Sequence, residues 1–304
     1  MAVVLIGGGS GLVGTRLSEL LIAEGHEVRH FSRSAKTQGK IKTFQWDVNA
    51  GTYDAAAFKN VTHVINFAGA GIVDKRWTNA RKKVIIESRT QSTRLLKKGI
   101  AEHGQAVKAY LAASAIGYYG DRGETLVDET SAPGDGFLSE SVLQWEAATA
   151  EVPDELQLPT LIVRIGIVLS TKGGALPQML LPLNFLTSVY FGDGQQWYSW
   201  IHIDDICRIF IKGIEDKTFR GLYNGVAPNP QRNKDFAQAL IDATDSSALL
   251  VPSPVFAMKI ALGEMAHTVL DSNKVSAQKA QEAGFEFQYP QLVEAVRHLK
   301  ANDI

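Results

Sequence analysis

The residues most able to do chemistry lie in a glycine-rich stretch near the start of the chain. In VVLIGGGSGLVGTRL (3–17), an apolar run leads directly into three glycines with G-x-x-G-x-x-G spacing. Such glycines allow a tight turn, let a diphosphate approach the backbone, and let a helix pack closely against a strand. The start of that helix would offer free N–H groups and partial positive charge to the phosphates. We expect a dinucleotide-binding turn formed by Gly8, Gly11, Leu12, Val13 and Gly14.

The end of the second apolar run indicates which dinucleotide is bound. NAD sites usually place an acidic residue there to hold the ribose 2′-hydroxyl. This chain has HFSRSAK, with Ser32, Arg33 and Ser34 and no carboxylate. Because a guanidinium makes forked contacts to phosphate, we expect NADP(H), with Arg33 at its 2′-phosphate. Asp47, followed by Val48, is placed to meet the adenine amino group, although ordinary solvation of a loop explains Asp47 nearly as well.

The composition argues against several other functions. The 304 residues carry a formal net charge of -1, so no global field favours nucleic acid or an anionic membrane, and we expect neither as a partner. Cys207 is the only cysteine and lies among apolar residues, which is typical of a buried core position. No Cys/His cluster has zinc-ligand spacing, and we expect no metal. Without a basic leader or a membrane-length apolar run, the expected location is cytoplasmic.

Short apolar runs alternate with helical patterns through the first half of the chain. Helices are expected at 13–25 and 79–103, and strands at 2–6, 26–32, 41–48, 61–69, 106–114 and 158–166. This alternation predicts crossover connections and a parallel sheet. The apolar runs are nearly continuous because both faces of such a sheet are buried. We therefore expect an α/β fold, a Rossmann-like doubly wound parallel sheet with a smaller C-terminal mixed α/β lobe.

The pattern of the sequence changes after about residue 170, where a Gly pair, prolines and amphipathic helical patterns replace the alternation. We expect residues 1–170 to form an NADP-binding Rossmann domain, with residues 200–225 packing back on it. Residues 171–304 should form a smaller substrate-side lobe that is mainly helical at its end. A small-molecule substrate would lie between the strand ends and this lobe.

Several further motifs carry a family resemblance. They are GGGSGLVG, NFAGAG (66–71), ASAIGYYGD (113–121), RIGIVLS (164–170) and WIHIDDICR (200–208). In this order they resemble the extended or atypical short-chain dehydrogenase/reductases of the NAD-dependent epimerase/dehydratase type. SRTQSTRLL (88–96) and FLSESVLQWEAA (137–148) are similar to an uncharacterised "epimerase family" with a C-terminal segment of unknown function. The resemblance covers essentially the whole chain.

The resemblance implies roles for individual residues. The three glycines would hold the pyrophosphate, and Ser32 and Arg33 the 2′-phosphate. Phe67, Ala68 and Gly69 would line the adenosine and ribose at the end of the fourth strand. Arg89, on the long helix, would approach the ribose or phosphate, and Val168 would lie beside the nicotinamide. Relatives often pair through two long helices, here near 79–103 and 137–150, so a monomer and a homodimer both stay open.

The catalytic pattern of the superfamily is missing. Its Tyr-x-x-x-Lys pair and a serine move a proton while a hydride moves at the nicotinamide. No tyrosine of this chain has a lysine four residues later, and alignment on Glu146 puts Leu138 and Val142 at the two positions. Ala115 occupies the serine position and Ser114 lies one residue earlier. A one-residue slip on a strand points a side chain to the opposite face unless a bulge restores it.

Other side chains could supply the proton. Tyr118 and Tyr119 follow the fifth strand, which delivers residues to the cofactor, and Ser114 could assist them; a packing role explains Tyr118 equally well. His202 lies in WIHIDD, which is chiefly structural in relatives. The following loop also carries carboxylates that could act as an acid or base: Asp121, Glu124, Asp128 and Glu129.

Two classes of function fit these observations. The first is an NADP(H)-dependent oxidoreductase, or an epimerase- or dehydratase-like enzyme, with an atypical acid. The second is a catalytically silent NADP(H)-binding sensor or regulatory protein, which the missing Tyr/Lys pair motivates. A sugar-nucleotide enzyme would also need a basic pocket for a second pyrophosphate, for which STKGG and Arg232 give faint support.

Overall fold

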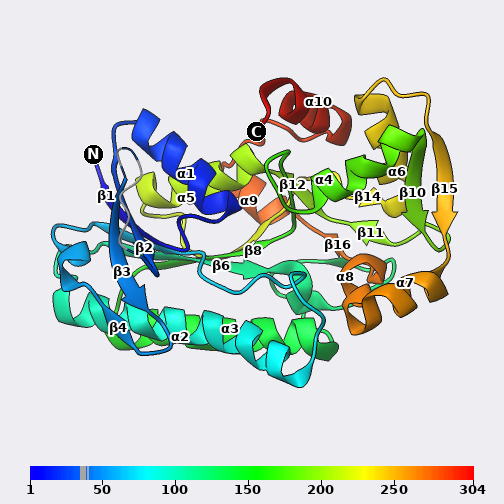
Figure 1. The fold of residues 1–304 in the computed structure, drawn as a ribbon. Coiled ribbons are helices and arrows are strands. Elements are labelled where there is room, and N and C mark those ends of the chain that lie inside the picture. The colour runs from blue at the N-terminus through cyan, green and yellow to red at the C-terminus, as the bar shows by residue number, and fades with distance from the viewer. Residues whose placement is uncertain (35–38, 40) are drawn as a thin grey trace.

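A computed structural model describes residues 1–34, 39 and 41–304 of the chain. Within this part, eight strands form the main sheet in the order β13-β8-β6-β5-β1-β2-β3-β4 (Figure 1). Every neighbouring pair is parallel except β3 and β4. The strands are β1 (Val3–Gly7), β2 (Glu27–Ser32), β3 (Lys42–Asp47), β4 (Thr52–Tyr53), β5 (His63–Asn66), β6 (Ala109–Ala115), β8 (Thr160–Ile165) and β13 (Gly221–Gly225).

The other elements are helices and short strand pairs. The α-helices are α1 (Leu12–Ala23), α2 (Asn79–His103), α3 (Gly136–Leu156), α4 (Ala175–Leu180), α5 (Ile203–Glu215), α6 (Asn233–Ala243), α7 (Val255–Leu262), α8 (His267–Leu270), α9 (Gln278–Glu282) and α10 (Leu292–Asn302). The short 3-10 helices are η1 (Ala55–Phe58), η2 (Ile116–Tyr119), η3 (Leu181–Phe185) and η4 (Gly263–Ala266). The remaining strands are β7 (Leu126–Val127), β9 (Ile167–Leu169), β10 (Thr187–Phe191), β11 (Trp197–Tyr198), β12 (Trp200–His202), β14 (Gln231–Arg232), β15 (Leu249–Ser253) and β16 (Lys274–Val275).

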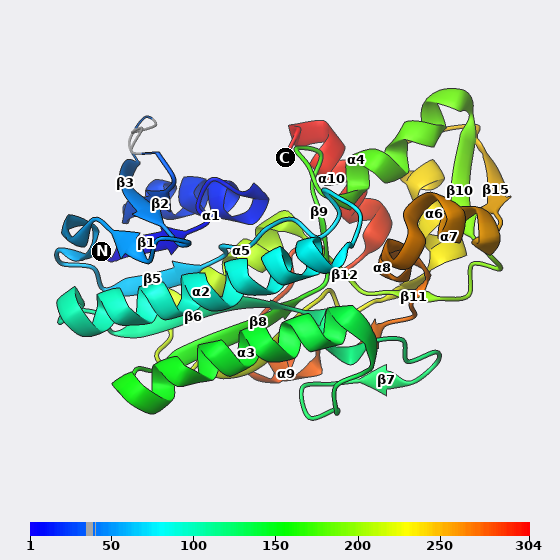
Figure 2. The same ribbon diagram turned by 60° about the horizontal axis from the view of Figure 1, so that its bottom comes forward.

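Helices cover both faces of the sheet. α2 and α3 lie side by side on one face, and α1 and α5 lie on the other (Figures 1 and 2). Along β1, Val4 and Ile6 join the core that contains Leu17 of α1, whereas Leu5 joins the core that contains Leu96 of α2. Both faces are therefore buried, which is why the strands are nearly continuous apolar runs. The predicted Rossmann-like, doubly wound α/β fold is confirmed.

The predicted elements agree with the structure to within a few residues, and α2 has the predicted bounds. The clearest difference is the fourth predicted strand, which was expected to reach residue 69 but ends at Asn66 as β5. The Asn66 side-chain oxygen accepts a hydrogen bond from the Ala68 N–H at 3.0 Å, which turns the backbone out of the sheet. β13 was not expected as a strand because GLYNG has no apolar run; it forms by pairing with β8.

The order of the strands creates a crevice at one end of the sheet. β1 pairs with β2 on one side and with β5 on the other. The chain continues outward to β3 in one direction and to β6 and β8 in the other. Ligands of open α/β sheets bind at the carboxyl ends of the strands where this reversal occurs. The glycine-rich turn follows β1 at this point.

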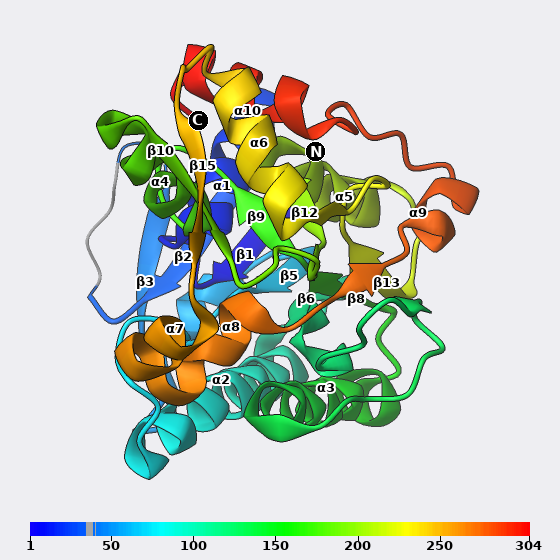
Figure 3. The ribbon, with the colours of Figure 1, turned by 90° about the vertical axis from the view of Figure 1, so that its right-hand side faces the viewer.

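Most of the residues after β8 form a second lobe, which lies beside the sheet at the right of Figure 1 and faces the viewer in Figure 3. It contains the parallel pair β10–β15, with α6 packed on β10 and α10 packed on α6. α5, β12 and β13 return to the main sheet, where β13 forms its edge and α5 packs on α1. Among the described residues, no helix is long and apolar enough to cross a membrane.

The close packing inside the glycine-rich turn gives a prediction about stability. In Gly14→Ala the added Cβ would lie 2.7 Å from both the Gly8 carbonyl oxygen and the Gly9 Cα. Because the obstacle is backbone, we expect the free energy of unfolding to fall by ~2 kcal/mol or more, measured by urea unfolding followed by circular dichroism. Gly11→Ala is the matched control, since its Cβ would meet only the Gly8 oxygen, at 3.3 Å.

Gly11 has an ordinary φ of -76° and caps α1, where alanine is a poorer cap than glycine. We therefore expect Gly11→Ala to cost less than ~1 kcal/mol. Equal losses in the two variants would show that packing inside the turn does not limit stability.

Candidate cofactor and substrate site

The glycine-rich turn is held against the loop that follows β5. Gly8 has a φ of +77°, and a Cβ placed on it would lie 2.7 Å from the Ala68 backbone nitrogen. Gly11 N–H donates to the Gly8 carbonyl at 3.0 Å, which closes the turn before α1. The structure thus brings Phe67 and Ala68 beside the first glycine, as the sequence predicts for one binding site.

The turn leaves room for a diphosphate at the start of α1. Gly11 is the N-cap of α1, and no side chain caps the helix. The first N–H groups of α1 are therefore available to an anion. A cavity of about 430 Å³ borders this point, lined by Gly11, Leu12 and Lys172 among others. The uncapped helix start and the open side of Gly11 fit the pyrophosphate of a dinucleotide.

Arg89 projects from α2 toward the same crevice. Its guanidinium packs on Gly69, where an added Cβ would lie 3.0 Å from the Arg89 Cζ. It donates to the carbonyls of Ala70 and Ile85 at 3.0 and 2.9 Å. No carboxylate of the described residues forms an ion pair with it, and burial, with help from Arg81, lowers the pKa of Arg89 to about 10. A cation in this position suits a ligand that brings negative charge.

The predicted 2′-phosphate residues lie at the end of β2. Ser32 Oγ accepts a hydrogen bond from the Ser34 N–H at 3.4 Å. Arg33 is exposed, and its carbonyl accepts from the Gln45 side chain at 3.5 Å. Asp47 accepts from the N–H groups of Asn49 and Ala50 at 2.9 and 3.0 Å, so its carboxylate closes a turn. This contact favours the loop explanation for Asp47 over an adenine contact.

The remaining predicted cofactor residues are apolar and partly buried. Leu12 and Val13 form the first turn of α1 and pack against the core on that face. Val48 packs against the core on the α2 face. Val168 lies on β9, paired with Ile201 of β12, and also packs against the α1 core. Of these four residues, Leu12 also lines the cavity at the start of α1.

Ser114 points away from the cavity expected for the substrate. Its side chain is 3% exposed, and its Oγ donates to Glu146 of α3 at 2.5 Å. Glu146 also receives two hydrogen bonds from the Arg164 guanidinium, at 2.8 and 2.7 Å. Ala115, the next residue, faces the cavity instead. This arrangement agrees with the register argument, and it places Ser114 in a buried ionic network.

Tyr119 belongs to the same network. It is fully buried, its hydroxyl donates to Asn224 at 2.7 Å, and it accepts from Arg164 at 3.1 Å. Burial raises the pKa of Tyr119 to about 12. Tyr118 lies with its ring centre 3.3 Å from the Arg164 Cζ, in a stacked contact. The Tyr119 hydroxyl is therefore already engaged by two protein partners, which favours a structural role for Tyr119, whereas the contact of Tyr118 involves its ring.

A cavity of about 190 Å³ occupies the place where the superfamily carries its catalytic pair. Leu138 and Val142 line it, together with Ala115, Ile116 and Gly117. Neither Leu138 nor Val142 can exchange a proton. The wall formed by the Rossmann domain is therefore apolar.

The opposite wall comes from the second lobe and is polar. It includes His267 and Asp271, whose Nδ1 and Oδ1 atoms are 2.8 Å apart, and Asn273. Burial raises the pKa of Asp271. The sequence prediction missed this pair, although the H-x-x-x-D spacing in HTVLD is a local signal of a contact across one helical turn.

The four carboxylates of the loop after η2 have structural contacts. Glu124 forms a bidentate ion pair with Arg232 at 2.9 Å, and Glu129 accepts from the Asn224 N–H at 2.7 Å. Asp121 accepts from the Ser272 N–H at 3.1 Å, and Asp128 accepts hydrogen bonds from the two residues that follow Glu129. Because Glu124 neutralises Arg232, the basic pocket that a sugar nucleotide would need gains no support there.

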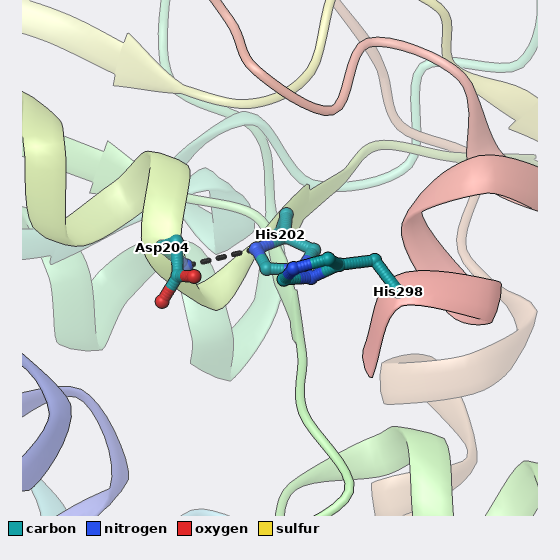
Figure 4. Close-up of side chains that lie close together, drawn as sticks. All are labelled: His202, Asp204 and His298. Carbon is teal, nitrogen blue, oxygen red and sulfur yellow. Dashed lines mark hydrogen bonds between the residues drawn. The ribbon is translucent and has the colours of Figure 1, made fainter. Parts of the chain in front are cut away.

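His202, Asp204 and His298 lie close together (Figure 4). His202 Nδ1 accepts from the Asp204 N–H at 2.9 Å and caps α5, while its Nε2 is 3.2 Å from His298 Nδ1. The Asp204 carboxylate receives two hydrogen bonds from Arg16 of α1. Burial lowers the pKa of His202 to about 3. Each ring nitrogen and carboxylate oxygen that could coordinate a metal already has a partner in the protein. The cluster therefore joins α1, α5 and α10.

Comparison with known proteins supports the Rossmann-like fold and membership of a dinucleotide-dependent family. Residues 4–224 match the NAD dependent epimerase/dehydratase family, and residues 253–299 match a domain of unknown function, DUF1731. The human epimerase family protein SDR39U1 is 35% identical over 302 residues, which cover 98% of this chain and 99% of the relative.

Two solved structures are also similar over nearly all of the chain. The crystal structure of human SDR39U1 (isoform 2) with NADPH has a TM-score of 0.88, 32% identity, and coverage of 99% of both chains. A nucleoside-diphosphate sugar epimerase from Corynebacterium glutamicum has a TM-score of 0.78 and 32% identity, covering 98% of this chain and 57% of that one. The resemblance predicted from the motifs is confirmed: the chain belongs to the NAD dependent epimerase/dehydratase family, in the group of epimerase family proteins that carry a C-terminal DUF1731 segment.

Proposed function

We propose that this protein is an NADP(H)-dependent oxidoreductase, or an epimerase- or dehydratase-like enzyme, that works without the Tyr-x-x-x-Lys pair. The observation that carries the proposal is the open turn at Gly11, where an uncapped helix start meets the crevice between β1 and β5. A dinucleotide diphosphate is the ligand that such a turn fits. The human relative with 32% identity was crystallised with NADPH, which supports the same cofactor here.

The cofactor would be held by residues from three elements. The turn residues Gly8, Gly11 and Gly14 and the N–H groups of Leu12 and Val13 would hold the diphosphate. Ser32, Arg33 and Ser34 would hold the 2′-phosphate, and Phe67, Ala68, Gly69 and Arg89 would lie along the ribose. The nicotinamide would supply or accept a hydride near Val168. Ser114, Tyr118 and Tyr119 would stabilise the fold next to the site through their contacts with Glu146 and Arg164.

A silent NADP(H)-binding sensor is the second candidate function. Its support is the pair Leu138 and Val142, which leave the Rossmann wall of the cavity without a proton donor. The experiment that separates the two functions follows the absorbance of NADPH with a panel of aldehydes, ketones, quinones and nucleotide sugars. Turnover supports an enzyme. Tight NADPH binding without turnover on the whole panel supports the sensor.

Replacement of Gly11 separates binding from folding. In Gly11→Ala the methyl group would occupy the space through which a diphosphate reaches the backbone. We expect NADPH to bind at least ~10-fold more weakly, a loss of ~1.4 kcal/mol, by isothermal titration calorimetry. Unfolding of the same sample should stay close to the wild type, as predicted above. Unchanged NADPH affinity in this variant would contradict the assignment of the diphosphate to this turn.

Charge reversal at Arg33 tests the choice of cofactor. We expect the wild-type protein to bind NADPH more tightly than NADH, because the guanidinium contacts the 2′-phosphate. Arg33→Glu should remove this preference, mainly through weaker NADPH binding, in calorimetric titrations with both cofactors. Lys98→Glu is a matched control, since it reverses an exposed charge on α2. A preference that survives in Arg33→Glu would exclude Arg33 as the 2′-phosphate residue.

A further inference from the structure

The cavity of about 190 Å³ has one wall that cannot exchange protons. The Rossmann domain contributes apolar side chains and glycines to it, including Ala115, Leu138 and Val142. Hydride transfer to or from a carbonyl carbon requires that a proton reach or leave the oxygen. The source of that proton must therefore be sought on the wall that the second lobe contributes.

Three titratable side chains occupy that second wall: Tyr198, His267 and Asp271. The Tyr198 hydroxyl donates to the Val269 carbonyl at 2.6 Å, and burial raises the pKa of Tyr198 well above its usual range. Tyr198 is therefore a poor proton donor near neutral pH. His267 and Asp271 remain, and an imidazole can hold a partner on one ring nitrogen while the other exchanges a proton with a substrate.

His267 and Asp271 form an oriented pair at the mouth of the cavity. His267 begins α8, and its Nδ1 lies 2.8 Å from Oδ1 of Asp271, which follows the same helix. The His267 side chain is 62% exposed and that of Asp271 is 17% exposed. Within the part of the chain that the structure describes, His267 Nε2 has no hydrogen-bond partner. A carboxylate on Nδ1 fixes the orientation of the ring and leaves Nε2 for a ligand.

Asn273 is a further polar residue of the same wall. Its Oδ1 is buried and lacks a hydrogen-bond partner in the described residues. Asn273 lines the same cavity as His267, beyond Asp271 in the chain. A buried acceptor without a donor is costly, so this wall differs from the apolar wall that the Rossmann domain contributes.

We propose that His267, oriented by Asp271, is the catalytic acid–base of this protein and that its substrate is a small carbonyl compound or the corresponding alcohol. The proposal rests on the proposed NADP(H)-dependent function. A bound reduced nicotinamide would supply the hydride for the new C–H bond at the carbonyl carbon, and the C=O π electrons would move to the oxygen. The proton of His267 Nε2 forms the O–H bond, and its N–H electrons stay on the ring. Asp271 remains ionised and is a positioning residue.

Other charged groups share the cavities that border His267, and they will contribute to any pH profile. Glu264 of η4 is paired with Lys82 of α2 at 2.6 Å. Asp121 approaches from the loop after η2, and Asp135 from the start of α3. The larger outer cavity adds Glu124, Asp193 and Lys259.

The first test does not depend on turnover. Diethyl pyrocarbonate modifies accessible imidazoles, and peptide mass spectrometry reads the rate at each histidine. We expect saturating NADPH to slow modification of His267 several-fold, while adenosine 2′,5′-bisphosphate, which lacks the nicotinamide, leaves the rate unchanged. His103, 41% exposed at the far end of α2, is the internal control and should react equally in all samples. Equal modification of His267 in free and NADPH-bound protein would overturn the proposal.

The second test uses turnover of small aldehydes, ketones and 9,10-phenanthrenequinone with NADPH. His267→Gln should lower kcat about 100-fold and remove the limb of the pH profile that requires a protonated acid, with NADPH affinity unchanged in calorimetry. Asp271→Asn should shift that limb and lower kcat less. His103→Gln is the matched control and should behave as wild type.

The outcomes separate this proposal from the proposed function. Absence of NADPH binding by the wild-type protein would reject the proposed function itself. Normal NADPH binding together with a full kcat in His267→Gln would reject only the role of His267. NADPH binding by a wild-type protein that turns over none of the carbonyl probes would reject the proposed substrate class and, with it, the catalytic role of His267.

Discussion

The contact on which this structure depends is the direct approach of two backbones at Gly8 and Ala68. The turn after β1 lies against the loop after β5 with no space for a side chain between them. This contact occurs where the winding of the sheet reverses. The same contact fixes the direction in which α1 begins. This approach sets the start of α1 and, with it, the turn that we propose to hold a diphosphate.

Much of the fold could be predicted because its signals are local. The apolar runs for β1, β2, β6 and β8 and the glycine spacing are short patterns that require no knowledge of tertiary contacts. β13 could not be found in this way, since GLYNG becomes a strand only by hydrogen bonding to β8. The end of β5 was also misplaced, because the side chain of Asn66 competes with the sheet for the next N–H group.

The residues of the candidate site also fall into two groups: those that local sequence patterns predict and those that depend on tertiary contacts. The residues of the glycine-rich turn can be predicted from the spacing of the glycines. The direction of Ser114, away from the cavity and toward α3, can be predicted by counting residues along the strand. The role of Tyr119 cannot, because it depends on Arg164 and Asn224, which lie 45 and 105 residues away. Glu146, Arg164 and Tyr119 form a buried network in which every partner is needed, so removal of one member would leave a buried charge or hydroxyl unpaired. His267 and Asp271 were missed because only the fold brings their helix to the cavity.

The position of α8 has a consequence for how this protein can change over evolution. The turn proposed to hold the coenzyme lies in the first strand–helix unit, whereas His267 lies in the DUF1731 segment, 253–299. If His267 is the acid, exchange of that segment alone would replace it, while the turn, which is formed by backbone, would stay unchanged.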